Sequence, residues 1–191
     1  MRLSIWVVLL GLWSCQEVSN SNTTSRYYKV DSLISAQQVA LYTNNAALEK
    51  KAYIGADSAV VTFTPDSVQW QDELNILKKA DISNPTLDGI YVSEITDDPN
   101  SNLTVRTTST DKVDAEVKFF KLYYLERVGE LRKFEAMWEE KNPLNSSQKI
   151  VTLFFEDIHD QVLLKSYKIK GTQKMILQDT VKFEITGTIK Y

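Results

Sequence analysis

Residues 115–125 read Ala-Glu-Val-Lys-Phe-Phe-Lys-Leu-Tyr-Tyr-Leu, and this stretch decides the fold class. Its first apolar residues alternate with polar ones, which is the period-two pattern of a β-strand. Phe120, Leu122 and Tyr124 then make the opposite face apolar as well, and residues 150–155 behave in the same way. We therefore expect central strands covered on both faces, by a helix on one side and by sheet curvature or a second layer on the other. An apolar pocket inside a curved sheet is the alternative.

The rest of the chain after residue 89 consists of similar runs, separated by turn residues at hairpin spacing. Examples of these turns are Asn142-Pro143-Leu144-Asn145 and Lys170-Gly171. Connections this short force neighbouring strands to be antiparallel, so the pattern predicts a β-meander. The expected strands of this meander are residues 90–96, 103–110, 115–125, 131–139, 149–155, 162–169, 174–178 and 181–189. A further strand at residues 58–64 is expected between the two helices described below.

Two helices are expected before this meander. From Asp31 the apolar residues repeat at helical spacing, and Gly55 marks the end of this first helix. A second helix starts at Pro65-Asp66-Ser67, where Asp66 or Ser67 can serve as the cap, and is stopped by the break at residues 81–85. The fold class that follows is α+β, with two N-terminal helices packed on a curved antiparallel β-meander of about seven to nine strands. Residues 30–191 are expected to form this single domain.

The first 14 residues have the features of a signal peptide, because Arg2 precedes an apolar run that is too short to span a bilayer. The segment Leu12-Trp13-Ser14-Cys15 resembles the lipobox of bacterial lipoproteins, although Trp13 departs from that pattern. The resemblance implies that Cys15 carries fatty acyl chains such as palmitate. An ordinary cleaved secretory peptide with an unmodified cysteine, or a core cysteine, is the alternative.

Residues 15–29 would then form a lipidated cysteine and a flexible tether, since residues 16–25 are small and polar. The anchor would make the membrane a partner of the chain through Cys15. Glu17 stands alone after the cysteine, whereas export to the cell exterior is associated with an acidic cluster at this place. We therefore expect attachment to the outer membrane on its periplasmic side.

Charge and side-chain inventory argue against several classes of function. The chain carries a net charge of −3 and no basic cluster, so we expect no nucleic-acid partner. His159 is the only histidine and lies among Glu156, Asp157 and Asp160, which a divalent metal could bind. A charged, solvated hairpin turn is the interpretation we favour. We expect no cofactor and no catalytic residue, because no nucleophile and base occur in a recognisable spacing.

Three stretches, Trp70 to Leu74, Ala80 to Pro85 and Tyr167 to Met175, resemble small uncharacterised lipoproteins of Bacteroidota. This resemblance implies an origin and an architecture, and it brings no known activity. A likeness at the level of the fold is to periplasmic carriers that hold acyl chains under a curved sheet closed by helices. Fold alone does not determine function, so this second likeness is an analogy.

Two non-enzymatic functions follow as expectations. The first is an envelope binding or interaction module that contacts a protein partner through surface around Trp138, Tyr123 and Tyr124. The second is a carrier that holds a lipid or another apolar ligand between helices and sheet. The candidate ligand-binding residues for the carrier are Trp70, Phe119, Phe154 and Phe183.

Overall fold

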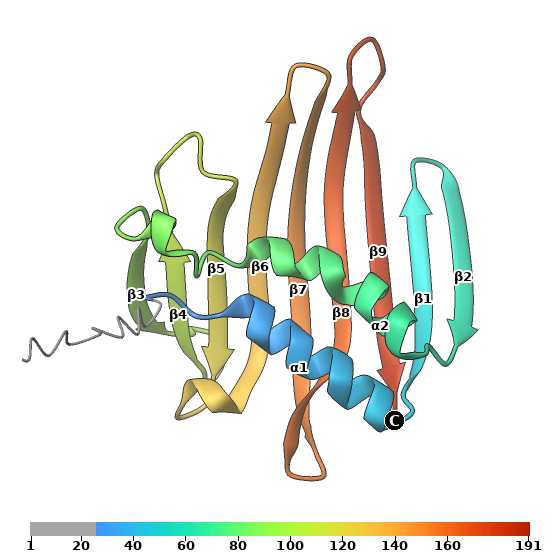
Figure 1. Ribbon diagram of the computed structural model, residues 1–191, viewed down its shortest axis with the longest axis vertical. Coiled ribbons are helices and arrows are strands. Elements are labelled where there is room, and N and C mark those ends of the chain that lie inside the picture. The colour runs from blue at the N-terminus through green and yellow to red at the C-terminus, as the bar shows by residue number, and fades with distance from the viewer. Residues whose placement is uncertain (1–25) are drawn as a thin grey trace, which may run out of the picture.

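The computed structural model describes residues 26–191, so the expected signal peptide, Cys15 and most of the expected tether lie outside the described residues. The strands are β1 (Ala47–Ile54), β2 (Asp57–Phe63), β3 (Val92–Asp97), β4 (Thr104–Ser109), β5 (Val117–Tyr124), β6 (Leu131–Asn142), β7 (Asn145–Ile158), β8 (Gln161–Met175) and β9 (Val181–Lys190). They form one nine-stranded antiparallel sheet in the order β2-β1-β9-β8-β7-β6-β5-β4-β3 (Figure 1). Within residues 26–191, β2 and β3 do not pair with each other, so the sheet is open.

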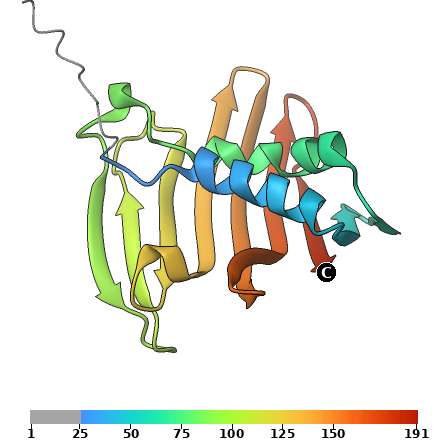
Figure 2. The same ribbon diagram turned by 60° about the horizontal axis from the view of Figure 1, so that its bottom comes forward.

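Two α-helices lie on the same face of this sheet, α1 (Val30–Thr43) and α2 (Ser67–Asn75) (Figures 1 and 2). Short 3-10 turns follow at Ile76–Ala80, Pro85–Leu87 and Val128–Glu130. The α+β class and the antiparallel sheet are therefore confirmed. The expectation of two N-terminal helices is wrong, because the β1–β2 hairpin separates α1 from α2.

The first helix is shorter than expected, since it ends at Thr43 and not near Gly55. Asn44 donates its backbone N–H to the carbonyl of Ala40, and Asn45 then takes a left-handed φ of 49°. Asparagine tolerates this conformation at the end of a helix better than most residues do. Leu48 keeps the apolar spacing of the helix and is fully buried, but it belongs to strand β1. The helical spacing of apolar residues therefore predicted a helix wrongly beyond Thr43.

Strand β1 joins the sheet beside β9, the last strand in the sequence. It pairs with β9 from Ala47↔Lys190 to Ile54↔Phe183, so the first hairpin extends the edge of the meander. Strands β3 to β9 follow one another in space as they do in sequence, which confirms a meander for these seven strands.

Strand β8 is continuous through Lys170 and Gly171, so the turn expected there is wrong. Gly171 is opposite Phe183 and Gly187 is opposite Tyr167 in the β8–β9 pair. In both cases the aromatic ring occupies the space that a Cβ on the glycine would need. These glycines permit close packing of rings across the strands, which is a different use of glycine from a turn.

The core lies between the helices and one face of the sheet and is filled by large side chains. Trp70, Phe120 and Phe134 are fully buried there. Gln37 of α1 joins the helix to β8, because its amide donates to Val162 O at 3.0 Å and accepts from Leu164 N at 2.8 Å. Within residues 26–191, both α-helices and the sheet share this one core.

Candidate binding surface on the open face of the sheet

The face of the sheet opposite the helices is uncovered in the part of the chain that the structure describes (Figure 2). The β7 side chains show this most clearly, because Val151 and Leu153 are buried while Ile150 is 43% exposed and Phe154 is 44% exposed. The two-sided core that we expected for residues 150–155 is therefore wrong. We call the face of the sheet opposite the helices the open face. Its apolar residues, such as Ile150 and Phe154, face solvent.

Lysines and glutamates form ladders across the open face. Glu184 of β9 lies between two lysines of β8, with its carboxylate 2.9 Å from Lys168 Nζ and 3.2 Å from Lys170 Nζ. Glu49 accepts in the same way from Lys190 and Lys51, each at 2.9 Å. Hydrogen bonds from Lys190 and then from Lys51 lower the pKa of Glu49 to about 2, and those from Lys168 and Lys170 lower the pKa of Glu184.

Lysines outnumber carboxylates on this face, although the whole chain has a net charge of −3. Neither Lys174 nor Lys182 has a carboxylate oxygen within 4.0 Å among the described residues. The strand register places Lys51, Lys121, Lys133, Lys141, Lys168, Lys170, Lys174, Lys182 and Lys190 on the open face, together with Glu49, Glu94, Glu135, Glu139, Glu156 and Glu184.

Tyr123 is held in place on the open face by two neighbours. Its hydroxyl donates to Glu135 at 2.8 Å, and Lys133 Nζ lies 4.2 Å from the centre of its ring. Lys133 also pairs with Glu135 at 2.8 Å. Burial and then the hydrogen bond to Glu135 raise the pKa of Tyr123, so the phenol stays protonated and keeps this donor.

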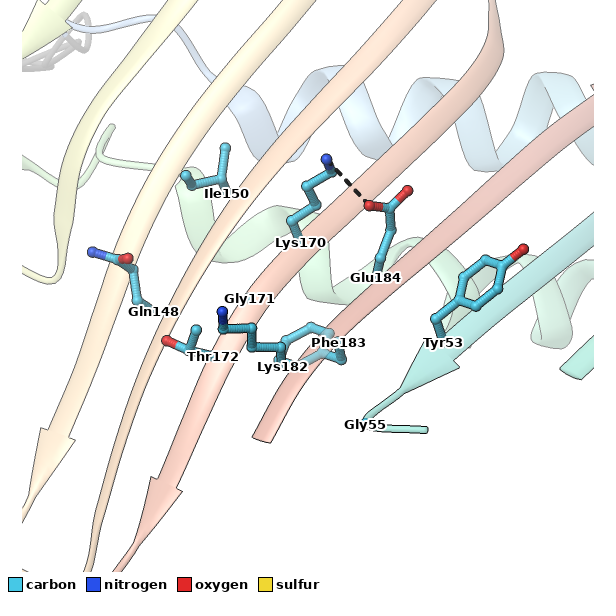
Figure 3. Close-up of a pocket in the computed structure, with 10 residues that line it drawn as sticks. All are labelled: Tyr53, Gly55, Gln148, Ile150, Lys170, Gly171, Thr172, Lys182, Phe183 and Glu184. Atoms are coloured by element: carbon cyan, nitrogen blue, oxygen red, sulfur yellow. Dashed lines mark ion pairs between the residues drawn. The ribbon is translucent and has the colours of Figure 1, made fainter. Parts of the chain in front are cut away.

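A hollow of about 390 Å³ opens on this face across β7, β8, β9 and β1 (Figure 3). One cross-strand row of its lining is Ile150, Lys170, Glu184 and Tyr53, and Gln148, Thr172 and Lys182 form the next row. The hollow thus combines apolar side chains with amide, hydroxyl and ammonium groups. Such a mixture suits a partner that has both apolar and polar atoms.

A second hollow of about 500 Å³ lies on the helix face, between α2 and the strand ends that extend past it. Its apolar lining comes from Phe63, Ile76, Ile169, Phe183 and Ile185.

Glu73 of α2 joins the wall of this second hollow to the sheet. The Glu73 carboxylate is 2.8 Å from Lys50 Nζ and also accepts a hydrogen bond from the Tyr167 hydroxyl. Burial, followed by this hydrogen bond, raises the pKa of Tyr167, so the tyrosine remains a donor.

The four residues proposed for a carrier do not come together. Trp70 is fully buried in the core, and Phe183 lines both hollows. Phe119 and Phe154 lie on the open face, with the sheet between them and Trp70. Only Phe183 therefore belongs to an apolar hollow on the helix side.

The three residues proposed for an interaction surface are also divided. Trp138 and Tyr124 are buried on the helix side, so their expected place on the surface is wrong. Tyr123 is the one that reaches the open face. Adjacent aromatic residues in a strand point to opposite faces, and the sequence does not show which face the helices cover.

His159 lies in the β7–β8 turn, where His159 and Asp160 both have left-handed φ angles, of 50° and 60°. Residues 26–191 contain no group of three or more His, Cys, Asp or Glu side chains placed to hold a metal ion. No helix in this part of the chain has both the length and the apolar composition required to cross a membrane.

The alternation in residues 181–189 predicts one buried and one solvated face for the last strand, but the expectation of covered faces for residues 150–155 concealed how far the open face extends. Lys168, Lys170 and Thr172 alternate along β8, and Lys182, Glu184 and Thr186 alternate along β9, which is typical of strands with one solvated face. The pairing of β8 with β9 brings Lys168 and Lys170 next to Glu184, where they form the ion pairs described above.

Comparisons with known proteins give no family for this chain. No protein-family model, no curated protein and no solved structure matches it.

Proposed function

We propose that this protein is a non-enzymatic binding module of the bacterial envelope, anchored to the outer membrane through Cys15, and that its open face binds a protein partner. The observation that carries the proposal is the exposure of Ile150 and Phe154 between lysines on an uncovered sheet face. Interfaces commonly have such an apolar centre surrounded by polar groups. The excess of lysine on this face favours a partner with an acidic surface.

The arrangement of polar groups supports a binding role over a catalytic one. In the described part of the chain, the titratable groups that meet on the open face are lysine–glutamate pairs and the Tyr123–Glu135 hydrogen bond. Paired charges of this kind orient a partner and accelerate its association.

Site-specific photo-crosslinking in cells tests this proposal. A photo-crosslinking amino acid replaces Phe154 or Ile150, and the control carries it at Val39, which is 67% exposed on α1. We expect a discrete crosslinked product from positions 154 and 150 only. The proposal is wrong if position 39 gives the same products or if the two open-face positions give none.

A charge substitution at the centre of the surface adds a quantitative test. Ile150→Lys should weaken binding of the crosslinked partner at least about tenfold, because it removes an apolar side chain from the centre of the surface and puts a strongly hydrated ammonium group in its place. Since Ile150 is exposed, the unfolding temperature should change little. Val39→Lys on the helix side is the matched control.

The hollow beside α2 supports a second candidate function, a carrier of an apolar ligand. Its lining of Phe63, Ile169, Phe183 and Ile185 could cover part of an acyl chain. Native mass spectrometry of the chain purified from cell envelopes without refolding distinguishes the two functions. A carrier should show an extra mass that organic solvent removes, whereas a bare polypeptide mass that does not increase with envelope lipids contradicts it.

A further inference from the structure

The β6–β7 and β8–β9 hairpins end side by side at one end of the molecule (Figure 1), and both carry exposed apolar side chains there. The β6–β7 turn contributes Leu144, the end of β8 contributes Met175, and the β8–β9 turn contributes Ile176 and Leu177. Ile176 N donates to Leu144 O at 2.9 Å, so the two turns are in direct contact. We call these four residues the hairpin tip.

Leu177 has an unusual environment for an apolar residue. Its side chain is 99% exposed, and its φ is +60°, a left-handed value that branched side chains rarely adopt. Gln178 N donates to Met175 O at 3.2 Å, which makes Leu177 the third residue of a four-residue turn. Glycine or asparagine is preferred at this position when φ is positive. Neither backbone preference nor packing within the described chain accounts for a leucine here.

A collar of lysines lies directly behind the hairpin tip. Lys141 and Lys174 are both opposite Ser146, and Lys182 is opposite Thr172, so all three lie on the open face near this end. Lys141 pairs with Glu139, whereas Lys174 and Lys182 have no ion-pair partner in residues 26–191. Asp179 is the carboxylate within the β8–β9 turn.

From this arrangement we propose that the hairpin tip inserts into the interface of an anionic lipid membrane while the lysine collar contacts the lipid phosphates. Apolar side chains at the end and cations one layer behind match the two layers of a bilayer surface. A convex tip of four side chains offers too little area for a stable protein interface, which buries about 800 Å² on each partner. The hairpin tip is separate from Ile150 and Phe154, the apolar centre proposed above for a protein partner, whereas the lysine collar belongs to the same open face. Insertion of the tip requires no lipid on Cys15.

Fluorescent labelling tests insertion directly. Cys15 is the only cysteine, so residues 26–191 can carry a single engineered cysteine with an environment-sensitive dye. The dye is placed at Gln178→Cys in the turn, and at Val39→Cys on α1 as the control. With vesicles of phosphatidylethanolamine and phosphatidylglycerol, we expect a blue shift at position 178 and none at position 39. No shift at position 178, or equal shifts at both positions, overturns the proposal.

Vesicle flotation with substituted chains tests the two layers separately. Leu177→Asn should reduce partitioning at least about tenfold, since it removes the most exposed apolar side chain. Lys174→Gln with Lys182→Gln should lower binding to phosphatidylglycerol vesicles and leave binding to phosphatidylcholine vesicles unchanged. Unaltered flotation of Leu177→Asn overturns the proposal, and so does a lipid-free dimer that this substitution dissociates, because the tip would then bind a second copy.

The stability of the same variant separates a local effect from unfolding. Leu177→Asn should keep or raise the unfolding temperature, because asparagine tolerates a positive φ better than leucine. A loss of flotation together with a lower unfolding temperature would show that leucine at 177 has a structural role and would overturn the assignment.

Discussion

At the scale of single residues, two glycines of β8 and β9 determine how closely the aromatic rings approach the sheet. The ring of Tyr167 lies over Gly187, and the ring of Phe183 lies over Gly171. A Cβ on Gly171 would also lie 2.6 Å from the backbone oxygen of Gln148, which cannot move independently of β7. The hydroxyl of Tyr167 reaches Glu73 on α2, so the position of this ring also affects the contact between helix and sheet.

Gly187→Ala should lower the free energy of unfolding by about 2 to 3 kcal/mol, because the new methyl group overlaps the buried ring of Tyr167. Urea unfolding followed by circular dichroism measures the change. Gly129→Ala is the matched control, since nothing lies within 4 Å of a Cβ there, and it should change stability by less than about 0.5 kcal/mol. Equal effects of the two substitutions would contradict the packing role of Gly187.

At the scale of elements, α2 starts with a complete capping box. The Asp66 side chain accepts from Gln69 N at 2.8 Å, and Asp66 N donates to the Gln69 side chain at 2.9 Å. The helix has only nine residues, so its ends matter more than they would in a long helix. Glu73 then joins α2 to β1 and β8 through Lys50 and Tyr167.

Asp66→Ala should destabilise the domain by about 1 kcal/mol, because one backbone N–H at the start of α2 loses its acceptor. Thermal unfolding monitored at 222 nm provides the measurement. Ser67→Ala is the control at the next position, where the side chain does not serve as the cap. A larger loss for Ser67→Ala than for Asp66→Ala would show that the cap has been assigned to the wrong residue.

At the scale of the whole molecule, one face of the sheet packs against the helices, and the other face carries exposed lysine and glutamate side chains. Lysines lower the pKa values of Glu49, Glu139 and Glu184 on the open face, and Lys79 lowers that of Glu140 on the helix side. In each case the hydrogen bond from a lysine is the largest cause. The folded state therefore holds its carboxylates ionised at a pH where the unfolded chain has begun to bind protons.

The unfolding temperature should consequently stay nearly constant from pH 7 to about pH 5 and then fall as the pH decreases toward the folded-state pKa of Glu49, about 2. The unfolding temperature falls on acidification because these carboxylates have a lower pKa in the folded chain than in the unfolded chain, where it is about 4.5. Such a group stabilises the fold at a pH above about 4.5, and this stabilisation is lost as the pH falls through the folded-state pKa. Calorimetry across this range measures the effect. Glu184→Gln should make the acid-induced decrease smaller, and 1 M NaCl should weaken it by screening exposed pairs. An unfolding temperature that rises on acidification would contradict this account.

The chain itself determined the α+β class, the antiparallel meander and the start of α2 near Asp66 and Ser67. These features depend on neighbours in sequence, namely period-two alternation, short turns and the Asp66-Ser67 pair. Local pattern also led to errors. Leu48 continues a helical stripe, and Gly171 has the composition of a turn, yet both lie in strands.

Only the tertiary structure decided that residues 47–54 pair with 183–190 and that one face of the sheet remains open. Both outcomes depend on contacts between residues that are far apart in sequence. Alternation in the sequence shows that a strand has two different faces, but the position of the helices determines which face is buried. For this reason Phe154 lies on the open face, whereas Trp70 lies in the core. The hairpin tip is likewise created by two turns that meet only in the folded sheet, where Ile176 binds Leu144.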